Sequence, residues 1–219
     1  MLMIEGVLAA EDLERVRAGL AQAPFRDGRA TAGGEARKVK ANRQALGSDG
    51  TVGALARFVA QALARNELLQ LYARPAKCSP VMFNRYGPGE RYGLHTDDAF
   101  MAEGEERLRT DLSFTLFLSE PDSYDGGELV VIGSEGERAV KLPAGSLILY
   151  PTGALHRVAE VTAGERLAAV GWIQSLLRRS DQRELLFDLA RLRRAVGAGE
   201  SRLLLDKSLG ALLRMWGEG

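Results

Sequence analysis

The stretch from residue 81 to residue 174 constrains the fold most, because short apolar runs alternate there with turn-forming residues. The runs are rich in β-branched and aromatic side chains, and glycine, proline and aspartate separate them. The intervals are too short for the crossover connections that parallel strands need, so we expect antiparallel pairing. Eight strands are predicted, and their number and spacing indicate a jelly-roll, or double-stranded β-helix. They are Val81–Tyr86, Leu94–Asp97, Leu112–Leu118, Gly127–Ile132, Ala139–Leu142, Ser146–Tyr150, His156–Val161 and Arg166–Gln174.

Helical patterns precede this stretch. Leu13, Val16 and Leu20 recur at helical spacing behind an acidic first turn. The segment Thr51–Leu71 has one continuous apolar stripe and predicts a single amphipathic helix. Between these helices, Asp27–Lys38 is rich in glycine and charge, which is typical of an exposed loop or hairpin.

Helical patterns also follow the stretch, with leucine stripes over residues 180–196 and over Ser201–Met215. This tail is so apolar that we expect it either to cover one face of the β-domain or to form a homodimer interface. The sequence therefore predicts an α+β protein in three parts. Residues 1–77 form a helical and loop support region, residues 78–177 the jelly-roll domain, and residues 178–219 a helical extension.

Composition argues against several classes of partner. The 29 lysine and arginine residues balance 29 aspartate and glutamate residues, so no net charge attracts nucleic acid or an anionic membrane. No uncharged apolar run approaches the ~20 residues that cross a bilayer. The single cysteine, Cys78, cannot form an internal disulfide, and the first residues lack a basic leader. We expect a cytoplasmic protein.

The only two histidines, His95 and His156, both fall within the predicted β-domain. Alternate residues of a strand point to one face, so His95 and Asp97 present an imidazole and a carboxylate together. His156, on a distant strand, can supply a third ligand. Two imidazoles and one carboxylate on one side of a metal suit the Fe(II) of oxygenases. Asp98 is the competing carboxylate, but its side chain should face away from His95.

Arg166 opens a nearly continuous apolar run, Leu167–Ile173, which predicts a strand buried on both faces. An arginine at the mouth of such a strand is costly unless an anion pairs with it. Its guanidinium can hold a carboxylate through two parallel hydrogen bonds. The alternative is a salt bridge to a nearby acid such as Glu165 or Glu128.

Together these residues resemble the Fe(II)- and 2-oxoglutarate-dependent dioxygenases of the prolyl/lysyl hydroxylase type, and most closely the bacterial PKHD-type hydroxylases. The resemblance is best over residues 78–175. Its motifs are Tyr86-Gly87-Pro88-Gly89 with Tyr92 and His95-x-Asp97, then Asp125-Gly126-Gly127-Glu128-Leu129, and finally His156-Arg157-Val158 with Gly164-Glu165-Arg166. The stretch Lys40–Gln44 and the helical tail also fit the bacterial group.

The resemblance implies that His95, Asp97 and His156 hold Fe(II), and that Arg166 takes the far carboxylate of 2-oxoglutarate. Tyr86 matches a tyrosine that contacts the co-substrate, although a core tyrosine is the alternative. Further implications are oxidative decarboxylation to succinate and CO₂, hydroxylation of an unactivated C–H bond, and ascorbate as the reductant. A second hydroxyl partner for the far carboxylate has no clear match; Thr115 and Tyr150 are the candidates.

Other interpretations of the same residues stay open. The β-domain could be a non-catalytic metal- or ligand-binding module with structural histidines, or a zinc hydrolase could use the same triad. The substrate is open between a protein residue, a free amino acid and a small iron-chelating metabolite; we favour a small molecule or peptide. We interpret the basic stretch Lys38–Gln44 as a solvated face, with substrate binding as the alternative. Tyr92 is expected to shape the turn or the substrate mouth.

Overall fold

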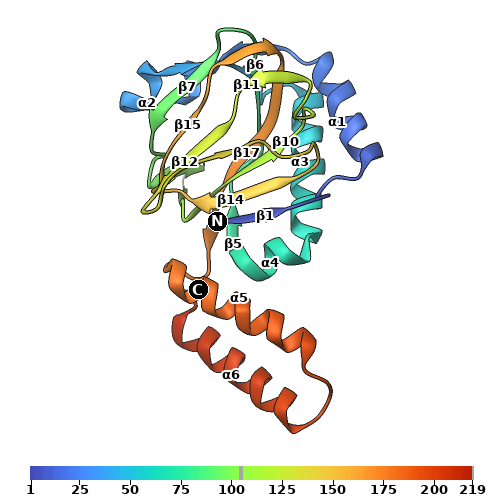
Figure 1. Ribbon diagram of the computed structural model, residues 1–219, viewed down its shortest axis with the longest axis vertical. Coiled ribbons are helices and arrows are strands. Elements are labelled where there is room, and N and C mark those ends of the chain that lie inside the picture. Colours follow the sequence, from blue (N-terminus) through green and yellow to red (C-terminus); the bar gives the residue numbers. More distant parts are fainter. Residues whose placement is uncertain (104–105, 219) are drawn as a thin grey trace.

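Two antiparallel sheets form the body of the protein (Figure 1). The computed structural model describes residues 1–103 and 106–218 of the 219-residue chain. The larger sheet has eight strands, in the order β1-β14-β10-β17-β6-β4-β2, with β5 also paired to β17. These strands are β1 (Leu2–Ile4), β14 (Leu147–Pro151), β10 (Leu112–Phe117), β17 (Arg166–Ser175), β6 (Met82–Tyr86), β4 (Arg43–Ala45), β2 (Phe25–Asp27) and β5 (Pro75–Cys78).

The smaller sheet has five strands in the order β13-β12-β15-β7-β3. Its strands are β13 (Gly136–Val140), β12 (Leu129–Gly133), β15 (Leu155–Val158), β7 (Arg91–His95) and β3 (Lys40–Ala41). Two separate pairs complete the β-structure, β11 (Tyr124–Gly126) with β16 (Val161–Gly164) and β8 (Phe100–Glu103) with β9 (Glu106–Arg109). The antiparallel jelly-roll core is therefore confirmed.

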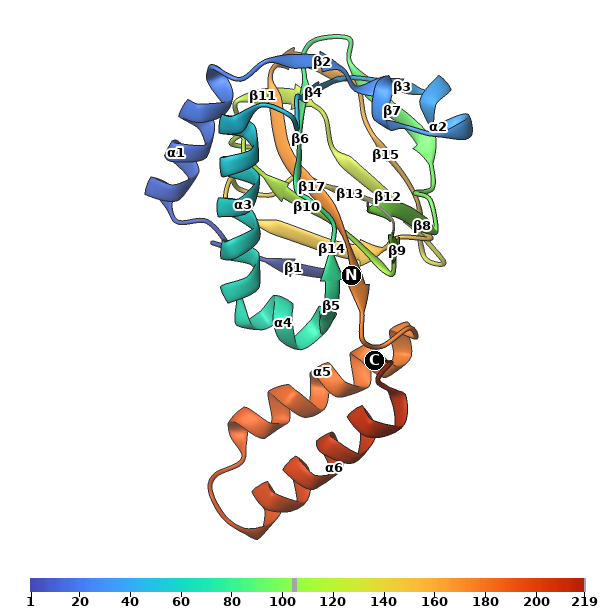
Figure 2. The same cartoon turned by 180° about the vertical axis from the view of Figure 1, so that it is seen from behind.

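The helices α1 (Ala10–Ala21) and α3 (Gly50–Arg65) cover one face of the larger sheet (Figure 2). Their apolar stripes are fully buried at Val16, Leu20 and Val59. These side chains share one hydrophobic cluster with Phe83 of β6 and Phe114 of β10. Because this face is closely packed against the helices, the larger sheet is a rigid support for the interior between the two sheets.

A helix break divides the segment that the sequence predicted as one helix, Thr51–Leu71. α3 ends at Arg65 and α4 spans Glu67–Ala73, with Asn66 in an extended conformation between them. The Asn66 side chain accepts a hydrogen bond from the Leu69 backbone N–H at 3.0 Å, and its own N–H donates to the Leu63 carbonyl. The single-helix prediction was wrong because this side chain offers the backbone a local alternative to the helix.

Two further predictions need correction near the N-terminus. The span Asp27–Lys38, expected to be an exposed loop or hairpin, is mostly exposed but holds two short helices, η1 (Gly28–Thr31) and α2 (Gly34–Lys38). The solvated face predicted for Lys38–Gln44 is wrong at Lys40, Asn42 and Gln44, which are buried. The stretch runs along β3 and β4, and strand geometry turns every second side chain inward.

Strand ends also differ from the prediction at functionally important places. β7 ends at His95, so Asp97 lies in the loop that follows rather than on the strand. The expected strand His156–Val161 is two strands, β15 and β16, because the chain leaves the smaller sheet after Val158. Strands β1 to β5 show that the first 78 residues contribute to the sheets as well as helices. The division into three regions stays a prediction.

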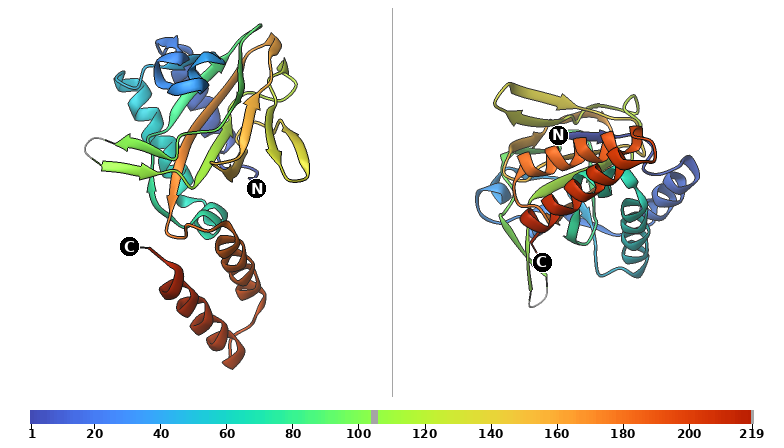
Figure 3. Two further views of the ribbon diagram at one scale, coloured as in Figure 1. Left: turned by 90° about the vertical axis from the view of Figure 1, so that its left-hand side faces the viewer. Right: turned by 90° about the horizontal axis from the view of Figure 1, so that it is seen from below.

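The C-terminal helices α5 (Ser180–Ala195) and α6 (Glu200–Trp216) form a hairpin that projects from the β-domain (Figures 1 and 3). Leu177, Leu186 and Leu209 are buried between them. At its base, Phe187 packs edge-on against Tyr72 of α4, with ring centroids 5.4 Å apart. Among the helices in the described part of the chain, none combines the length and apolar character that a membrane crossing requires.

Asn66→Ala is expected to lower the free energy of unfolding by about 0.5–2 kcal/mol, because α4 loses its N-cap acceptor. The matched control Asn66→Asp keeps an acceptor at the same place and should cost much less. Urea denaturation followed by circular dichroism measures both variants. Equal stability of Asn66→Ala and the parent protein would contradict the capping role.

Candidate active site

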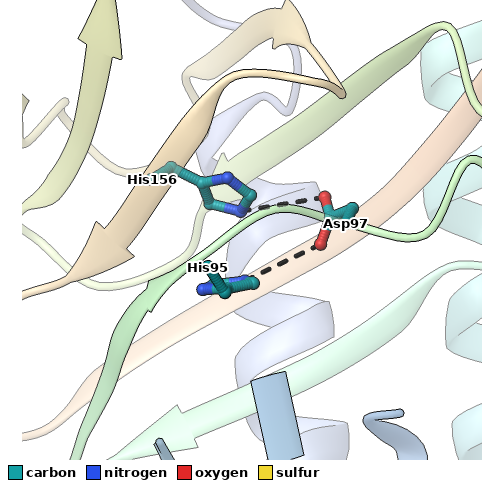
Figure 4. Close-up of side chains that lie close together, drawn as sticks. All are labelled: His95, Asp97 and His156. Atoms are coloured by element: carbon teal, nitrogen blue, oxygen red, sulfur yellow. Dashed lines mark ion pairs between the residues drawn. The ribbon is translucent and has the colours of Figure 1, made fainter. Parts of the chain in front are cut away.

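Three potential metal ligands meet between the two sheets (Figure 4). His95 lies at the end of β7 and is paired directly with His156 of β15 in the antiparallel ladder. The Nε2 atom of His95 is 3.7 Å from Asp97 Oδ1, and the Nε2 atom of His156 is 3.7 Å from Asp97 Oδ2. One donor atom from each residue lies within 4.8 Å of the others. The sequence-predicted triad is therefore brought together.

Both imidazoles are oriented by backbone carbonyls. The Nδ1 atom of His95 is 2.8 Å from the Gly93 oxygen, and that of His156 is 3.0 Å from the Ala154 oxygen. A carbonyl only accepts hydrogen bonds, so each Nδ1 carries a proton and Nε2 is the ring atom left to face a metal ion. Burial, followed by the neighbouring His156, lowers the pKa of His95 to about 4, which keeps this imidazole neutral at pH 7.

The arrangement fits a divalent metal ion. Each Nε2 lies 3.7 Å from an Asp97 oxygen, which is too far for a hydrogen bond. Both Nε2 atoms face the carboxylate oxygens, with room for an ion between them. Two imidazoles and one carboxylate suit non-haem Fe(II), and a carbonyl behind each imidazole is the usual outer support of such ligands.

Asp97 is held by two side chains that the sequence reasoning missed. Its Oδ2 atom accepts hydrogen bonds from Ser113 Oγ at 2.8 Å and from Trp172 Nε1 at 2.9 Å. The sequence could have indicated Trp172, because an even number of residues separates it from Arg166 on β17. The two side chains therefore lie on the same face of the strand. No comparable pattern marks Ser113.

Asp98 lies elsewhere. Its carboxylate is 3.5 Å from the position that a Cβ atom would take on Gly33, at the start of α2. Among the described residues, the cluster with metal-ligand geometry contains Asp97 and not Asp98. Asp98 is thus not brought into the triad, although the strand argument does not explain this, because both aspartates lie beyond the end of β7.

Arg166 is a buried cation without a charged partner. It is 2% exposed, and its guanidinium carbon lies 5.2 Å from the Tyr86 ring and 5.5 Å from the Phe117 ring. Its Nε atom is buried and has no hydrogen-bond partner. Within the described chain no carboxylate lies in ion-pair range of Arg166, and Glu165 pairs with Arg85 instead. Neither acid proposed from the sequence neutralises this charge.

Glycine in the Asp125–Leu129 motif makes room for Arg166. Gly127 has a φ of +68°, a conformation that side-chain-bearing residues rarely adopt. A Cβ atom there would lie 2.9 Å from the Tyr124 ring and 3.1 Å from Arg166 Cδ. The motif contributes backbone shape and space, and no reacting group.

Hydroxyl groups line the same interior. Burial raises the pKa of Tyr86 to about 12, so its phenol stays protonated at neutral pH. Tyr150 lies with its ring centroid 5.1 Å from that of His156, and burial raises its pKa while a hydrogen bond with Thr115 acts in the opposite direction. Tyr86, Thr115 and Tyr150 all line the same pocket as Arg166.

One pocket joins these groups. It encloses about 780 Å³, including the open space at its mouth, and reaches from η1 and α2 to the triad and Arg166. A concave pocket with a few converging polar groups is typical of a small-molecule site. Tyr92, expected at the mouth, stacks on the His95 ring with centroids 3.6 Å apart and an interplanar angle of 17°. The Tyr92 ring therefore covers one face of the His95 imidazole.

Comparisons with known proteins agree with this geometry. The model of the 2OG-Fe(II) oxygenase superfamily matches residues 81–174. A prolyl-4-hydroxylase from Pseudomonas putida has a TM-score of 0.53 and 22% identity, over 80% of this chain and 91% of its own. A prolyl hydroxylase from Trichoplax adhaerens has a TM-score of 0.56 and 16% identity, over 84% of this chain and 86% of its own. At such identities the two structures show a shared fold.

Closer relatives extend over the whole chain. A PKHD-type hydroxylase from Picosynechococcus is 47% identical over 219 residues, which cover 98% of each chain. A PKHD-type hydroxylase from Parvibaculum lavamentivorans is 52% identical over 220 residues, again 98% of each chain. This protein therefore belongs to the PKHD-type hydroxylases of the 2OG-Fe(II) oxygenase superfamily, and is an oxidoreductase of the dioxygenase class.

Proposed function

We propose that this protein hydroxylates an unactivated C–H bond while 2-oxoglutarate is decarboxylated to succinate and CO₂. One oxygen atom of O₂ enters succinate and the other enters the hydroxyl group of the product, so atoms and electrons balance. The observation that carries the proposal is the buried, unpaired Arg166 in the same pocket as the triad. A guanidinium there needs an anion, and a dicarboxylate provides one.

Each residue has a defined task in this proposal. His95, Asp97 and His156 hold Fe(II) on one side, and Arg166 and Tyr86 bind the far carboxylate of 2-oxoglutarate. Bound Fe(II) supplies the redox chemistry with O₂. The protein orients the co-substrate, keeps the His95 imidazole unprotonated at pH 7, and excludes water from the interior around the triad. Thr115 and Tyr150 both stay candidates for the second hydroxyl contact.

Neither competing interpretation accounts for every buried group. A zinc hydrolase could use the same three ligands, but it gives Arg166 no anion to bind. A non-catalytic module with structural histidines leaves both Nε2 lone pairs and the guanidinium without partners. Ascorbate as the reductant and a cytoplasmic location, suggested by the family resemblance and by the single cysteine, stay predictions.

Asp97→Ala is expected to abolish Fe(II) binding, because the site loses its carboxylate ligand and keeps only the two imidazoles. His95→Ala and His156→Ala should act alike. The matched control is Asp98→Ala, which removes the neighbouring carboxylate and should keep iron binding close to that of the parent protein. Iron content after anaerobic dialysis measures all four variants, and loss of iron in Asp98→Ala would move the ligand role to that residue.

Arg166→Ala is expected to raise the KM for 2-oxoglutarate a hundredfold or more, since breaking a buried charge pair costs about 3–5 kcal/mol. Succinate release at varied 2-oxoglutarate concentration measures the change. The control is Arg157→Ala, which lies next to His156 and pairs with Glu137 on the surface, and which should change the KM less than twofold. A normal KM in Arg166→Ala would assign the far carboxylate to another residue.

We further propose that the C-terminal hairpin forms a homodimer interface. It projects away from the β-domain, and Leu203, Leu204 and Met215 of α6 are 69%, 54% and 66% exposed. Burying these side chains against a second copy would stabilise the hairpin, whereas they cover no face of the β-domain.

Sedimentation equilibrium should therefore find a dimer, and the double substitution Leu203→Asp with Leu204→Asp should yield a monomer that remains folded. The control Glu184→Lys reverses an exposed charge near the start of α5, at the other end of the hairpin from the leucine pair, and should stay dimeric. A parent protein that is monomeric at micromolar concentration would refute this interface.

A further inference from the structure

A second buried cation lies in the wall of the pocket. Lys40, on the edge strand β3, is 6% exposed and lines the pocket together with the triad. Its Nζ atom donates to Thr31 Oγ1 at 3.2 Å and lies 5.1 Å from the centre of the Tyr92 ring. Within residues 1–103 and 106–218 no carboxylate lies in ion-pair range of this ammonium group. Within this part of the chain, Thr31 is the one hydrogen-bond acceptor of the ammonium group.

Contacts within the fold compensate the burial of Lys40 only in part, because the two carboxylates whose charge acts on it, Asp97 and Asp27, lie beyond ion-pair range. Burying an ammonium group is costly unless a negative charge or several acceptors compensate, and burial lowers the pKa of Lys40 to about 8. Its neighbour Lys38 shows the ordinary alternative, because it is exposed and pairs with Glu35 at 2.6 Å. The inward position of Lys40 therefore points to a ligand.

An unpaired acceptor lies along the same wall. Thr31 donates from its hydroxyl to Gln44 Oε1 at 2.6 Å, and Gln44 is paired in register with Asn84 across β4 and β6. Asn84 is 6% exposed and lines the pocket, and its Oδ1 atom is buried without a hydrogen-bond partner. Lys40, Thr31 and Asn84 thus form a polar wall of the pocket, with Gln44 behind Thr31, and this wall offers donors at Lys40 and a free acceptor at Asn84.

This polar wall is separate from the group assigned to 2-oxoglutarate. Arg166 lies between Tyr86 and Phe117 on the side of the larger sheet, whereas Lys40 lies over Tyr92 on an edge strand beside η1 and α2. Tyr92 also stacks on His95, so its ring lies between the Lys40 ammonium group and the His95 imidazole. One pocket therefore contains two buried cations that form no ion pair among the described residues, and a single dicarboxylate at Arg166 would neutralise only one.

We infer that Lys40 binds a carboxylate of the substrate, and that Asn84 Oδ1 accepts a hydrogen bond from an N–H or O–H group of the same molecule. This inference rests on the proposed function and deepens it by naming the substrate class, a small carboxylate-bearing molecule. A second carboxylate at Lys40 would compensate the buried charge. It would also hold the reacting carbon at a fixed place beside the triad.

The test uses the iron-loaded full chain and a small-molecule extract of bacterial cells as the probe. Anion exchange at neutral pH divides the extract into a retained and an unretained fraction. Succinate release above the rate without extract is measured for each fraction, and mass spectrometry follows compounds that gain one oxygen atom. We expect stimulation and an oxygenated product from the retained, anionic fraction.

Three variants identify the residue that recognises the anion. Lys40→Met keeps the apolar stem but removes the charge, and should raise the KM for the retained compound by about tenfold to a hundredfold. Lys40→Arg restores a cation and should recover part of the affinity. Lys38→Met removes the exposed lysine two residues away and should match the parent protein. Anaerobic binding of Fe(II) and 2-oxoglutarate by Lys40→Met separates a loss of substrate recognition from a loss of the metal centre.

Two results would overturn the inference while leaving the proposed function intact. One is stimulation that comes from the unretained fraction or from neither fraction, although the protein still converts 2-oxoglutarate to succinate. The other is an unchanged KM in Lys40→Met. Absence of any succinate under all conditions would instead remove the proposed function, and this inference with it.

Discussion

The register between β7 and β15 is the constraint on which the site depends, because it places His95 opposite His156. Two imidazoles on adjacent strands then share one interior face, with backbone carbonyls behind both rings. Asp97 completes the set from the loop beyond β7, where Ser113 and Trp172 of the larger sheet hold its carboxylate. The metal site thus joins the two sheets, and a slip of one residue in the smaller sheet would turn one imidazole away from the other.

Uncompensated charge is the second organising feature. Arg166 and Lys40 are both buried in the pocket wall, and neither has an acid in ion-pair range among the described residues. A protein that buries cations in this way loses stability unless ligands supply the missing anions. We therefore interpret the pocket as a site for two anionic molecules, a dicarboxylate at Arg166 and the substrate at Lys40. The fold supplies rigidity for both through the core between the larger sheet and helices α1 and α3.

The sequence predicted the jelly-roll and the residues that meet in the triad, because both depend on local patterns. Alternating apolar runs identify strands, and two histidines in a chain otherwise free of them leave few choices. It missed Ser113 and Trp172, which reach Asp97 only after distant strands pair. It also missed the helix break at Asn66, where one side chain outweighs a continuous apolar stripe. The burial of Lys40 was misjudged because a basic cluster resembles a solvated surface until the strand direction is known.

Anaerobic addition of Fe(II) and then 2-oxoglutarate to the metal-free protein tests the central claim most directly. The account predicts a weak visible charge-transfer band that develops only after both have been added, and succinate release once oxygen is admitted. Binding of iron without this band would keep the triad but remove the co-substrate role of Arg166. Binding of neither would contradict the assignment of the pocket as an Fe(II)- and 2-oxoglutarate-dependent centre.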